Sequence, residues 1–362
     1  MTADHIAARQ IIQSLRLRNA AASVALVCLA CGLYAIAPHN AAQMSSAYRL
    51  AGLGYTGYEF LFFSGACYTI ALIGFCVADP HPEESKSVQF FKVVGAFIRS
   101  PRSLMQRGLS RAERLAVLST VLKGFFGPFM VMALMSHVVG AFVNGAAIIT
   151  DASMGLGFFE MFNRHGYWLA LKIILFADVV VFTVGYLVEM PRLKNEIRSV
   201  DPTWLGWTAA LLCYPPFNQV TSAILGSAVT DFPQFDEPMT HVALNVALLL
   251  LMAIYASASV ALGLKASNLT HRGIVDKGPY RWVRHPAYVC KNMAWWIGSV
   301  PLVSASFATS NFAGISTIAT VMGWTLLYAL RAVTEEDHLR SVDSDYAAYA
   351  SRVRYRFIPG VV

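Results

Sequence analysis

Residues 241–264 read HVALNVALLLLMAIYASASVALGL, a stretch without one Asp, Glu, Lys or Arg. About 20 predominantly apolar residues suffice for an α-helix to cross the hydrocarbon core of a bilayer. The rest of the chain has the same character, because 56% of its 362 residues are hydrophobic and only 14% are charged, whereas soluble domains carry roughly a quarter charged residues. The sequence therefore predicts an all-α, polytopic membrane protein.

Eight apolar segments are predicted to span the membrane. They are Ala21–Ala37, Phe60–Ala78, Leu115–Val143, Tyr167–Val188, Trp204–Val229, His241–Leu264, Ala287–Val303 and Asn311–Leu330. The loops on one side of these segments carry 23 of the 28 Lys and Arg residues, and the loops on the other side carry 2. Because cytoplasmic loops are enriched in Lys and Arg, this split supports the count of eight and predicts that both termini are cytosolic. The first segment lacks a small-residue cleavage site, so we interpret it as a retained span.

The chain is predicted to form one membrane domain, residues 1–362. Within it, residues 1–264 form a six-helix region and residues 265–362 carry the chemistry. The basic residues are scattered over several loops, which argues against a nucleic-acid partner despite a net charge of +7. The six cysteines lie within or beside apolar segments, which favours packing over a metal or disulfide role, so no metal site is predicted. The sequence gives no oligomeric state.

The most informative segment is residues 271–291, HRGIVDKGPYRWVRHPAYVCK, which leads directly into the seventh predicted span. Pro286 suits the first turn of a helix, so a helix is expected to start near His285 at the membrane surface. The free N–H groups and the dipole of such a helix start favour an anionic group, and Arg284 would add donors there. Aromatic and basic residues beside a span are also common interfacial anchors, so a purely anchoring role for this segment remains an open alternative.

A second segment, RAVTEEDHL, follows the last predicted span at residues 331–339. Glu335 and Glu336 lie at the C-terminal end of a helix, where the macrodipole disfavours negative charge, and residues placed against local preference are candidates for function. Only a few residues separate the last two spans, so these form a hairpin. The start of one and the end of the other are therefore expected to lie close together.

These two segments together resemble a family of membrane methyltransferases. Arg284-His285-Pro286-Ala287-Tyr288 resembles the RHPxYxG signature of isoprenylcysteine carboxyl methyltransferases and related phospholipid methyltransferases. The RAxxEExxL pattern of that family is matched from Arg331 to Leu339, and its YxxY tail by Tyr346 and Tyr349. The resemblance covers residues 270–362. Cys290 departs from it, because the family has glycine at that position.

The resemblance implies an enzyme that binds S-adenosylmethionine in a cytosol-facing pocket capped by the C-terminal tail. It assigns cofactor binding to residues of both segments and a catalytic role to three of them, since a nearby base is needed if the acceptor is a protonated amine. The implied cofactor-binding residues are Tyr280, Arg284, His285, Tyr288, Arg331, Glu335 and Glu336, and the implied catalytic residues are His285, Glu335 and Glu336. Carboxylates would accept hydrogen bonds from the cofactor, Arg and His would meet its carboxylate, and aromatic faces would meet the adenine or sulfonium.

The acceptor is expected to be lipophilic or membrane-soluble, with a carboxylate, thiol or amine as its reacting group. Lys291, Arg352 and Asn218 are tentative acceptor contacts. Lys291 equally fits a lysine that snorkels to the interface. Asn218 follows Pro215-Pro216, which must break the fifth span, either to line a cavity or for packing.

Asp178 is predicted to lie deep in the fourth span, where an ionised group needs a partner. Lys123 lies at a compatible depth in the third span. An ion pair between them is expected, with a structural role favoured over a substrate site.

Two other functions remain open from the sequence. One is a membrane reductase of the sterol-reductase type that uses NADPH, because Val353-Arg354-Tyr355-Arg356 resembles its tail. The other is a non-enzymatic transporter or assembly module built around Asp178. For all three functions the chain is expected in the inner or plasma membrane, with the lipid bilayer as a partner and its site facing the cytosol.

Overall fold

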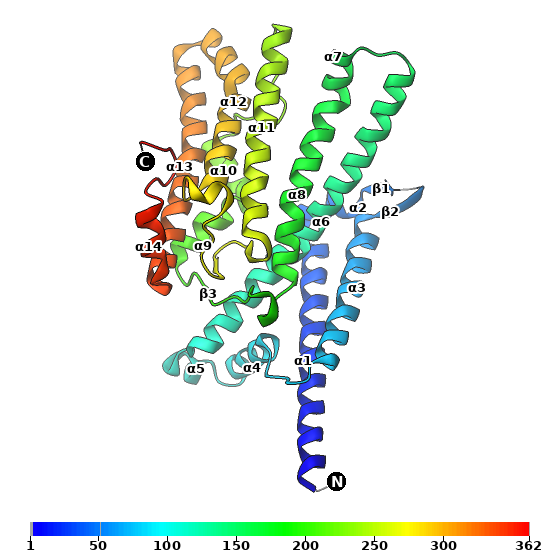
Figure 1. Ribbon diagram of the computed structural model, residues 1–362, viewed down its shortest axis with the longest axis vertical. Helices are drawn as coiled ribbons and strands as arrows, with labels where there is room; N and C mark the ends of the chain where they lie inside the picture. Colours follow the sequence, from blue (N-terminus) through cyan, green and yellow to red (C-terminus); the bar gives the residue numbers. More distant parts are fainter. Residues whose placement is uncertain (1–2, 51, 362) are drawn as a thin grey trace. The chain divides into compact units, whose positions relative to one another are not determined.

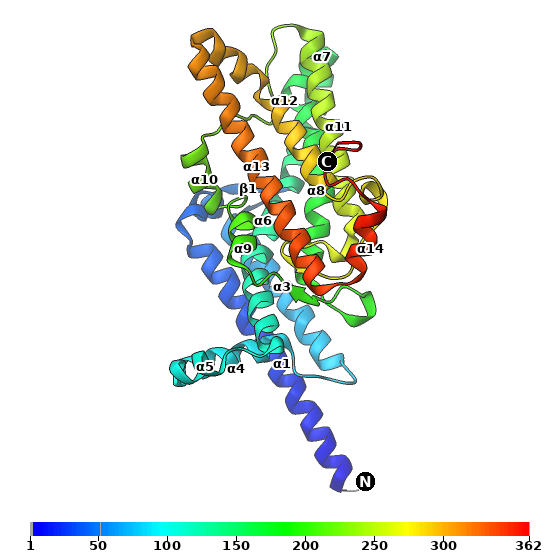
Figure 2. The ribbon, with the colours of Figure 1, turned by 90° about the vertical axis from the view of Figure 1, so that its left-hand side faces the viewer.

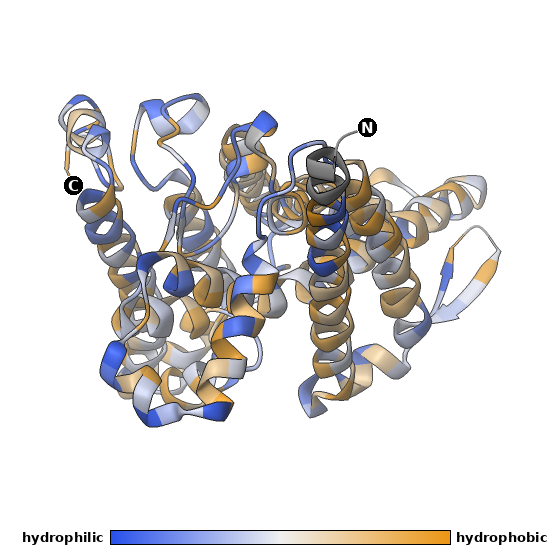
Figure 3. Ribbon diagram, turned by 90° about the horizontal axis from the view of Figure 1, so that it is seen from below, coloured by the Kyte–Doolittle hydropathy of each residue, from blue (hydrophilic) through white to orange (hydrophobic). Residues whose placement is uncertain are grey.

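The computed structural model describes residues 3–50 and 52–361, and nearly all of its regular structure is helical. Six helices of the described residues are long and apolar enough to cross a membrane. These are Gln10–Ile36, Gly57–Ala78, Arg111–Ser153, Phe158–Leu187, Pro238–Lys265 and Asn311–Val342. The predicted all-α polytopic membrane class is therefore confirmed, whereas the count of eight and the cytosolic termini remain predictions. Figure 3 shows that apolar residues dominate the long helices and that hydrophilic residues gather in the loops.

The chain falls into two compact units, Met1–Ala133 and Leu134–Val362. The expected single membrane domain, with regions divided at residue 264, stays a prediction. In the first unit, α1 (Ala3–Ile36) packs beside α3 (Gly57–Ala78). Thr56 caps α3 in a reciprocal capping box with Glu59, which satisfies two backbone donors at the helix start. The other elements of this unit are η1 (Pro38–Asn40), α2 (Ala41–Ser45), β1 (Ala47–Leu50), β2 (Leu53–Thr56), α4 (Lys86–Arg99), α5 (Pro101–Arg107) and the first part of α6 (Arg111–Ser153).

The long loop after α3 contains the helix α4, Lys86–Arg99. Ser85 caps α4 by accepting a hydrogen bond from the Val88 N–H. In Figures 1 and 2, α4 and α5 run across the direction of α1 and α3. That orientation fits an amphipathic helix that lies along a membrane surface.

The second unit contains the four helices that build the site. The helix α11 (Pro238–Leu262) packs against both α8 (Tyr167–Leu187) and α12 (Pro286–Thr309), and α12 packs in turn against α13 (Asn311–Val342). Ser310 is the single residue between α12 and α13, and it caps α13. The remaining elements of the second unit are the second part of α6, α7 (Phe158–Met161), η2 (Phe162–Gly166), η3 (Pro191–Leu193), β3 (Ser199–Val200), α9 (Trp204–Leu211), α10 (Phe217–Leu225), η4 (Gly263–Lys265), β4 (Thr270–His271), η5 (Gly278–Arg281) and α14 (Asp345–Arg352).

The fifth predicted span is broken where its prolines fall. The helix α9 ends at Leu211, and α10 begins at Phe217, directly after Pro215-Pro216. This interruption confirms the expected break in the helix, since proline removes a backbone donor and clashes with the preceding turn. Neither piece has the length of a span.

A glycine near the end of α8 lets the loop that leads to the site pack closely. A Cβ on Gly185 would lie 2.0 Å from the Ala266 carbonyl oxygen, so no larger residue fits there without moving the loop. Beyond this contact, Ser199–Val200 pairs antiparallel with Thr270–His271 as a two-stranded ribbon. Together these contacts fix residues 265–272 against α8 and β3.

Candidate active site

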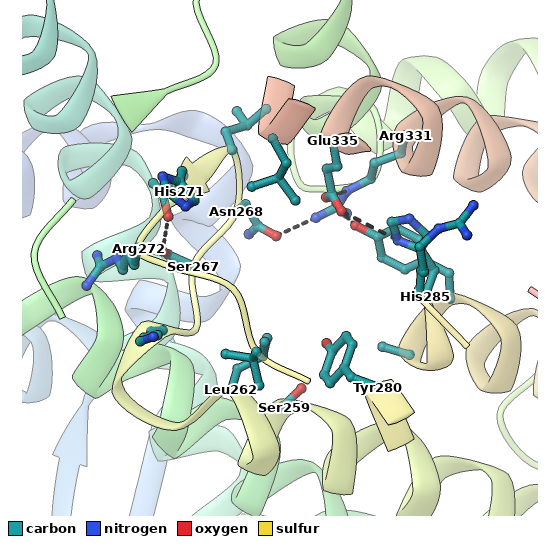
Figure 4. A pocket seen from close by; sticks show the side chains of 18 of the residues that line it. Ser259, Leu262, Ser267, Asn268, His271, Arg272, Tyr280, His285, Arg331 and Glu335 are labelled. Atoms are coloured by element: carbon teal, nitrogen blue, oxygen red, sulfur yellow. Dashed lines mark hydrogen bonds and ion pairs between the residues drawn. The ribbon is translucent and has the colours of Figure 1, made fainter. Parts of the chain in front are cut away.

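A pocket in the second unit lies between the start of α12, the C-terminal half of α13 and the loop that follows α11 (Figure 4). Its volume is about 200 Å³, whereas one water needs roughly 10–15 Å³, so a small organic molecule fits. Six of the seven expected cofactor-binding residues line it. They are Tyr280, Arg284, His285, Tyr288, Arg331 and Glu335.

Arg331 is the buried cation of this pocket, with 3% of its surface exposed. Its Nη2 donates to Asn268 Oδ1, and its Nε donates to Glu335 Oε1 over 3.3 Å. Its guanidinium carbon lies 5.1 Å from the ring centroid of Tyr288 and 5.5 Å from that of Tyr214, which are cation–π distances. The charge is therefore held by one carboxylate, one amide and aromatic faces.

Glu335 is the pocket carboxylate that keeps access to the cavity. Its side chain is 26% exposed, and its Oε1 accepts hydrogen bonds from the Tyr288 hydroxyl and from Arg331. Its Oε2 lies 3.9 Å from His285 Nδ1 and keeps lone pairs for a further donor. This oxygen suits a ligand amine or hydroxyl.

His285 and Tyr288 form a stacked pair at the start of α12. Their ring centroids lie 5.4 Å apart, and the ring planes differ by 11°. The structure starts α12 at Pro286 with His285 as N-cap, as the sequence predicts. Both side chains therefore lie beside the free N–H groups of the helix start.

Glu336 differs from its neighbour Glu335. Among the described residues, Glu336 is not one that lines the pocket, and its side chain is fully buried. Its carboxylate accepts from Arg284 Nε over 2.8 Å, from His285 Nε2 over 3.1 Å and from Arg356 Nε over 3.0 Å. Arg340, one turn later on α13, donates over 3.0 Å. These donors occupy the lone pairs of the Glu336 carboxylate. The geometry therefore favours a role in which Glu336 positions Arg284 and His285, rather than one in which it contacts a ligand. The expected direct role of Glu336 in binding or catalysis stays a prediction.

Arg284 also fastens the C-terminal tail over the site. Its Nη1 donates to the carbonyl oxygens of Val353 and Arg354 over 2.9 and 2.6 Å. Two backbone bonds of 3.0 Å continue this contact, from the Arg284 N–H to the Tyr355 carbonyl and from the His285 N–H to that of Arg356. The tail thus pairs with the segment just before α12.

The two tail tyrosines of α14 are buried against this segment. Tyr349 donates its hydroxyl to the Tyr280 carbonyl over 3.0 Å, and burial raises the pKa of Tyr349 to about 12. Burial, together with the charge of Glu335, also raises the pKa of Tyr280 well above its usual value. Both phenols stay neutral at physiological pH. Tyr280 therefore offers the pocket an aromatic face and a neutral hydroxyl.

Asn268 is a site residue that the sequence did not indicate. Its backbone N–H and its Nδ2 both donate to the Tyr186 hydroxyl over 2.8 Å, so its Oδ1 is left to accept from Arg331. An asparagine in a polar loop carries no local signal of such a role. Only the packing of the loop against α8 shows it.

Lys291 lines the inner end of the pocket, one turn along α12 from Tyr288. Its Nζ lies 5.3 Å from the ring centroid of Trp295, 5.4 Å from Tyr328 and 5.9 Å from Tyr255. Three aromatic rings from three helices thus surround the ammonium group. This geometry differs from a lysine extended to the membrane interface.

Asp178 has hydroxyl partners on α11. It accepts hydrogen bonds from Tyr255 over 3.1 Å and from Ser259. The expected pairing with Lys123 stays a prediction, since that residue belongs to the other unit.

The other two tentative acceptor contacts lie away from the pocket lining of the described chain. Arg352 is on the exposed face of α14 and pairs with Asp276 over 2.5 Å. Asn218 lies in the first turn of α10. Neither Arg352 nor Asn218 lines this pocket, and their contact with an acceptor stays a prediction.

Residues 239–341 match the family model of the isoprenylcysteine carboxyl methyltransferase (ICMT) family. The ICMT match contains α12, nearly all of α11 and α13, and every residue expected to bind the cofactor. It confirms the resemblance in the C-terminal part of the chain and supports a membrane methyltransferase. A search of curated proteins and a search of solved structures each found no match.

Proposed function

We propose that the chain is an integral membrane methyltransferase that takes its methyl group from S-adenosylmethionine and transfers it to a lipophilic acceptor. The observation that carries this proposal is the meeting of Arg331, Glu335, His285 and Tyr288 in one pocket within the ICMT match. The site is proposed to face the cytosol, in the inner or plasma membrane. The charge asymmetry of the loops supports that orientation.

The donor set of the pocket fits the polar groups of this cofactor. Glu335 Oε2 suits an amine or ribose hydroxyl, and the helix start at His285 suits a carboxylate. The stacked His285–Tyr288 pair and the Tyr280 ring give aromatic faces for a flat base or a sulfonium cation.

The reaction depends mainly on the alignment of the methyl donor with the acceptor. The bound cofactor supplies an electrophilic methyl group, and its transfer is an in-line displacement in which orientation accounts for much of the rate. Arg284 and Glu336 contribute by fixing the start of α12 and the tail, so that His285 and Tyr288 keep one orientation. Arg331 holds the Glu335 carboxylate toward the cavity. Tyr346 and Tyr349 of α14 are buried and line the pocket, which limits water access on that side.

Calorimetric titration of the purified protein in detergent with S-adenosylmethionine tests this proposal. We expect saturable binding to the wild type, and much weaker binding to Glu335→Gln. Asp276→Asn, on the surface beside the tail, serves as the matched control and keeps wild-type affinity. A wild type that binds NADPH but not S-adenosylmethionine would overturn the proposal in favour of a reductase.

A further inference from the structure

A carboxylate that the proposed cofactor site does not use lies just behind the pocket wall, beside Tyr255 and Ser259. Asp178 lies on α8 and is 6% exposed. Its Oδ2 accepts from the Tyr255 hydroxyl, and its Oδ1 accepts from the Ser259 hydroxyl. Tyr255 and Ser259 lie four residues apart on α11 and therefore share one face of that helix. Both line the pocket, whereas Asp178 lies behind them.

These two hydroxyls have a fixed polarity. A hydroxyl has one proton to donate, and each of these protons is directed to Asp178. The oxygen atoms of Tyr255 and Ser259 therefore present only lone pairs to the cavity. A ligand group that carries a proton can donate a hydrogen bond to these oxygen atoms. An ionised carboxylate has no proton to donate, so its lone pairs would face the lone pairs of Tyr255 and Ser259.

This wall lies close to the proposed cofactor site. Tyr328 lies near residues of both regions: its ring centroid is 5.3 Å from that of Tyr288 in the cofactor site and 5.4 Å from the ammonium group of Lys291, which lies beside the wall. Lys291 also lies over the Tyr255 ring and interacts electrostatically with Asp178. Figure 4 shows Ser259 beside Tyr280, with His285 and Glu335 on other sides of the same cavity.

We propose that Tyr255, Ser259 and Asp178 form an acceptor subsite for a lipophilic thiol or hydroxyl, and that they remove its proton during methyl transfer. This inference rests on the proposed methyltransferase function. The acceptor's sulfur or oxygen takes the methyl group with its own electron pair while the sulfur–carbon bond of the donor breaks and leaves a neutral thioether. The acceptor proton passes to the Tyr255 oxygen as the Tyr255 proton passes to Asp178. The carboxylate ends protonated, and the positive charge of the donor has been neutralised.

This assignment is tested with two acceptors of equal chain length. The thiol must lose a proton and needs a base, whereas the carboxylate does not. Purified protein is supplied with radiolabelled S-adenosylmethionine and either dodecanethiol or dodecanoate, and methylated product is counted. We expect the thiol to be the better acceptor by at least about tenfold. General-base assistance contributes roughly 10²- to 10⁴-fold, so Asp178→Asn and Tyr255→Phe should lower the thiol rate by that order.

The ratio of thiol to carboxylate rates separates this role from a structural one, since a misfolded variant loses both rates together. Ser257→Ala, an exposed serine on the same helix, is the matched control for Ser259→Ala and keeps the wild-type ratio. Calorimetry of S-adenosylmethionine on Asp178→Asn tests the cofactor site separately, and unchanged affinity is expected. If the cofactor binds but dodecanoate is preferred, if neither compound is methylated, or if Asp178→Asn leaves the ratio unchanged, the acceptor assignment is wrong.

Discussion

Arg284 and Glu336 are 52 residues apart in the sequence, yet the Arg284 Nε donates to the Glu336 carboxylate over 2.8 Å. The hairpin of α12 and α13, with Ser310 as its only linking residue, makes this contact possible. Through it, the start of one helix, the end of the other and the C-terminal tail are held together. The proposed cofactor site depends on that junction.

Replacing the carboxylate at this junction should destabilise the protein. Glu336→Gln removes the one negative charge that Arg284, Arg340 and Arg356 share, and breaking a buried ion pair costs about 3–5 kcal/mol. We expect a clear fall in the thermal unfolding midpoint in detergent. Asp276→Asn removes the exposed pair with Arg352, so its effect should stay under about 1 kcal/mol. Equal effects of the two variants would contradict the role of Glu336.

Glu335→Gln should weaken cofactor binding, and it should also lower the unfolding midpoint, because the buried Arg331 loses its carboxylate partner. A hydrogen bond to a charged group contributes about 1.5–3 kcal/mol, which corresponds to a dissociation constant raised roughly 10- to 150-fold. Tyr288→Phe keeps the stacked ring and loses only the hydroxyl bond to Glu335, so a smaller increase is expected. Calorimetry with S-adenosylmethionine, together with the unfolding midpoint, measures both. A dissociation constant that is unchanged in Glu335→Gln would remove this residue from the site.

His271 should make the protein less stable in mild acid. Burial lowers the pKa of His271 below 6.5, and the positive charges of Arg198 and Lys265 act in the same direction, although Asp343 Oδ2 lies 2.7 Å away and opposes them. As the pH falls below about 6.5, the unfolded chain takes up this proton before the folded protein does. The stability is thus fully present above that pH and is lost as the pH falls toward the folded pKa, by at most about 1.4 kcal/mol per pH unit.

Unfolding midpoints at pH 7.5 and 5.5 measure this effect. We expect His271→Gln to lose less stability than the wild type between the two pH values. His81→Gln, at an exposed histidine, serves as the control and should behave like the wild type. A wild-type midpoint that rises on acidification would show that the sign is wrong.

Single-cysteine labelling should reveal the topology. In a chain whose native cysteines are replaced, Ser310→Cys lies between α12 and α13 and should react with a membrane-impermeant maleimide on intact cells. Ser351→Cys, in α14, should react only after the cells are opened. The physical reason is the Lys and Arg enrichment of the loops on the side of the tail. Labelling of Ser351→Cys in intact cells would reverse the predicted orientation.

The sequence determined the class of the protein and the place of its site. Long apolar runs can bury their backbone polar groups in lipid only as helices, so 241–264 and its counterparts predict spans without knowledge of packing. Pro286 and Pro215-Pro216 act on the chain locally, and so the start of α12 and the break between α9 and α10 followed from sequence as well. The short link between α12 and α13 indicated that residues 284–288 and 331–336 would meet.

Only the tertiary structure decided how those residues divide their work. Adjacent Glu335 and Glu336 are chemically identical, but successive helical positions point about 100° apart, so one lines the pocket and the other is buried among cations. Asn268, Tyr255 and Ser259 carry no motif, and their contacts with Arg331 and Asp178 arise from how α8, α11 and α13 pack. Hydrogen bonds between distant segments depend on that packing, which no local pattern encodes.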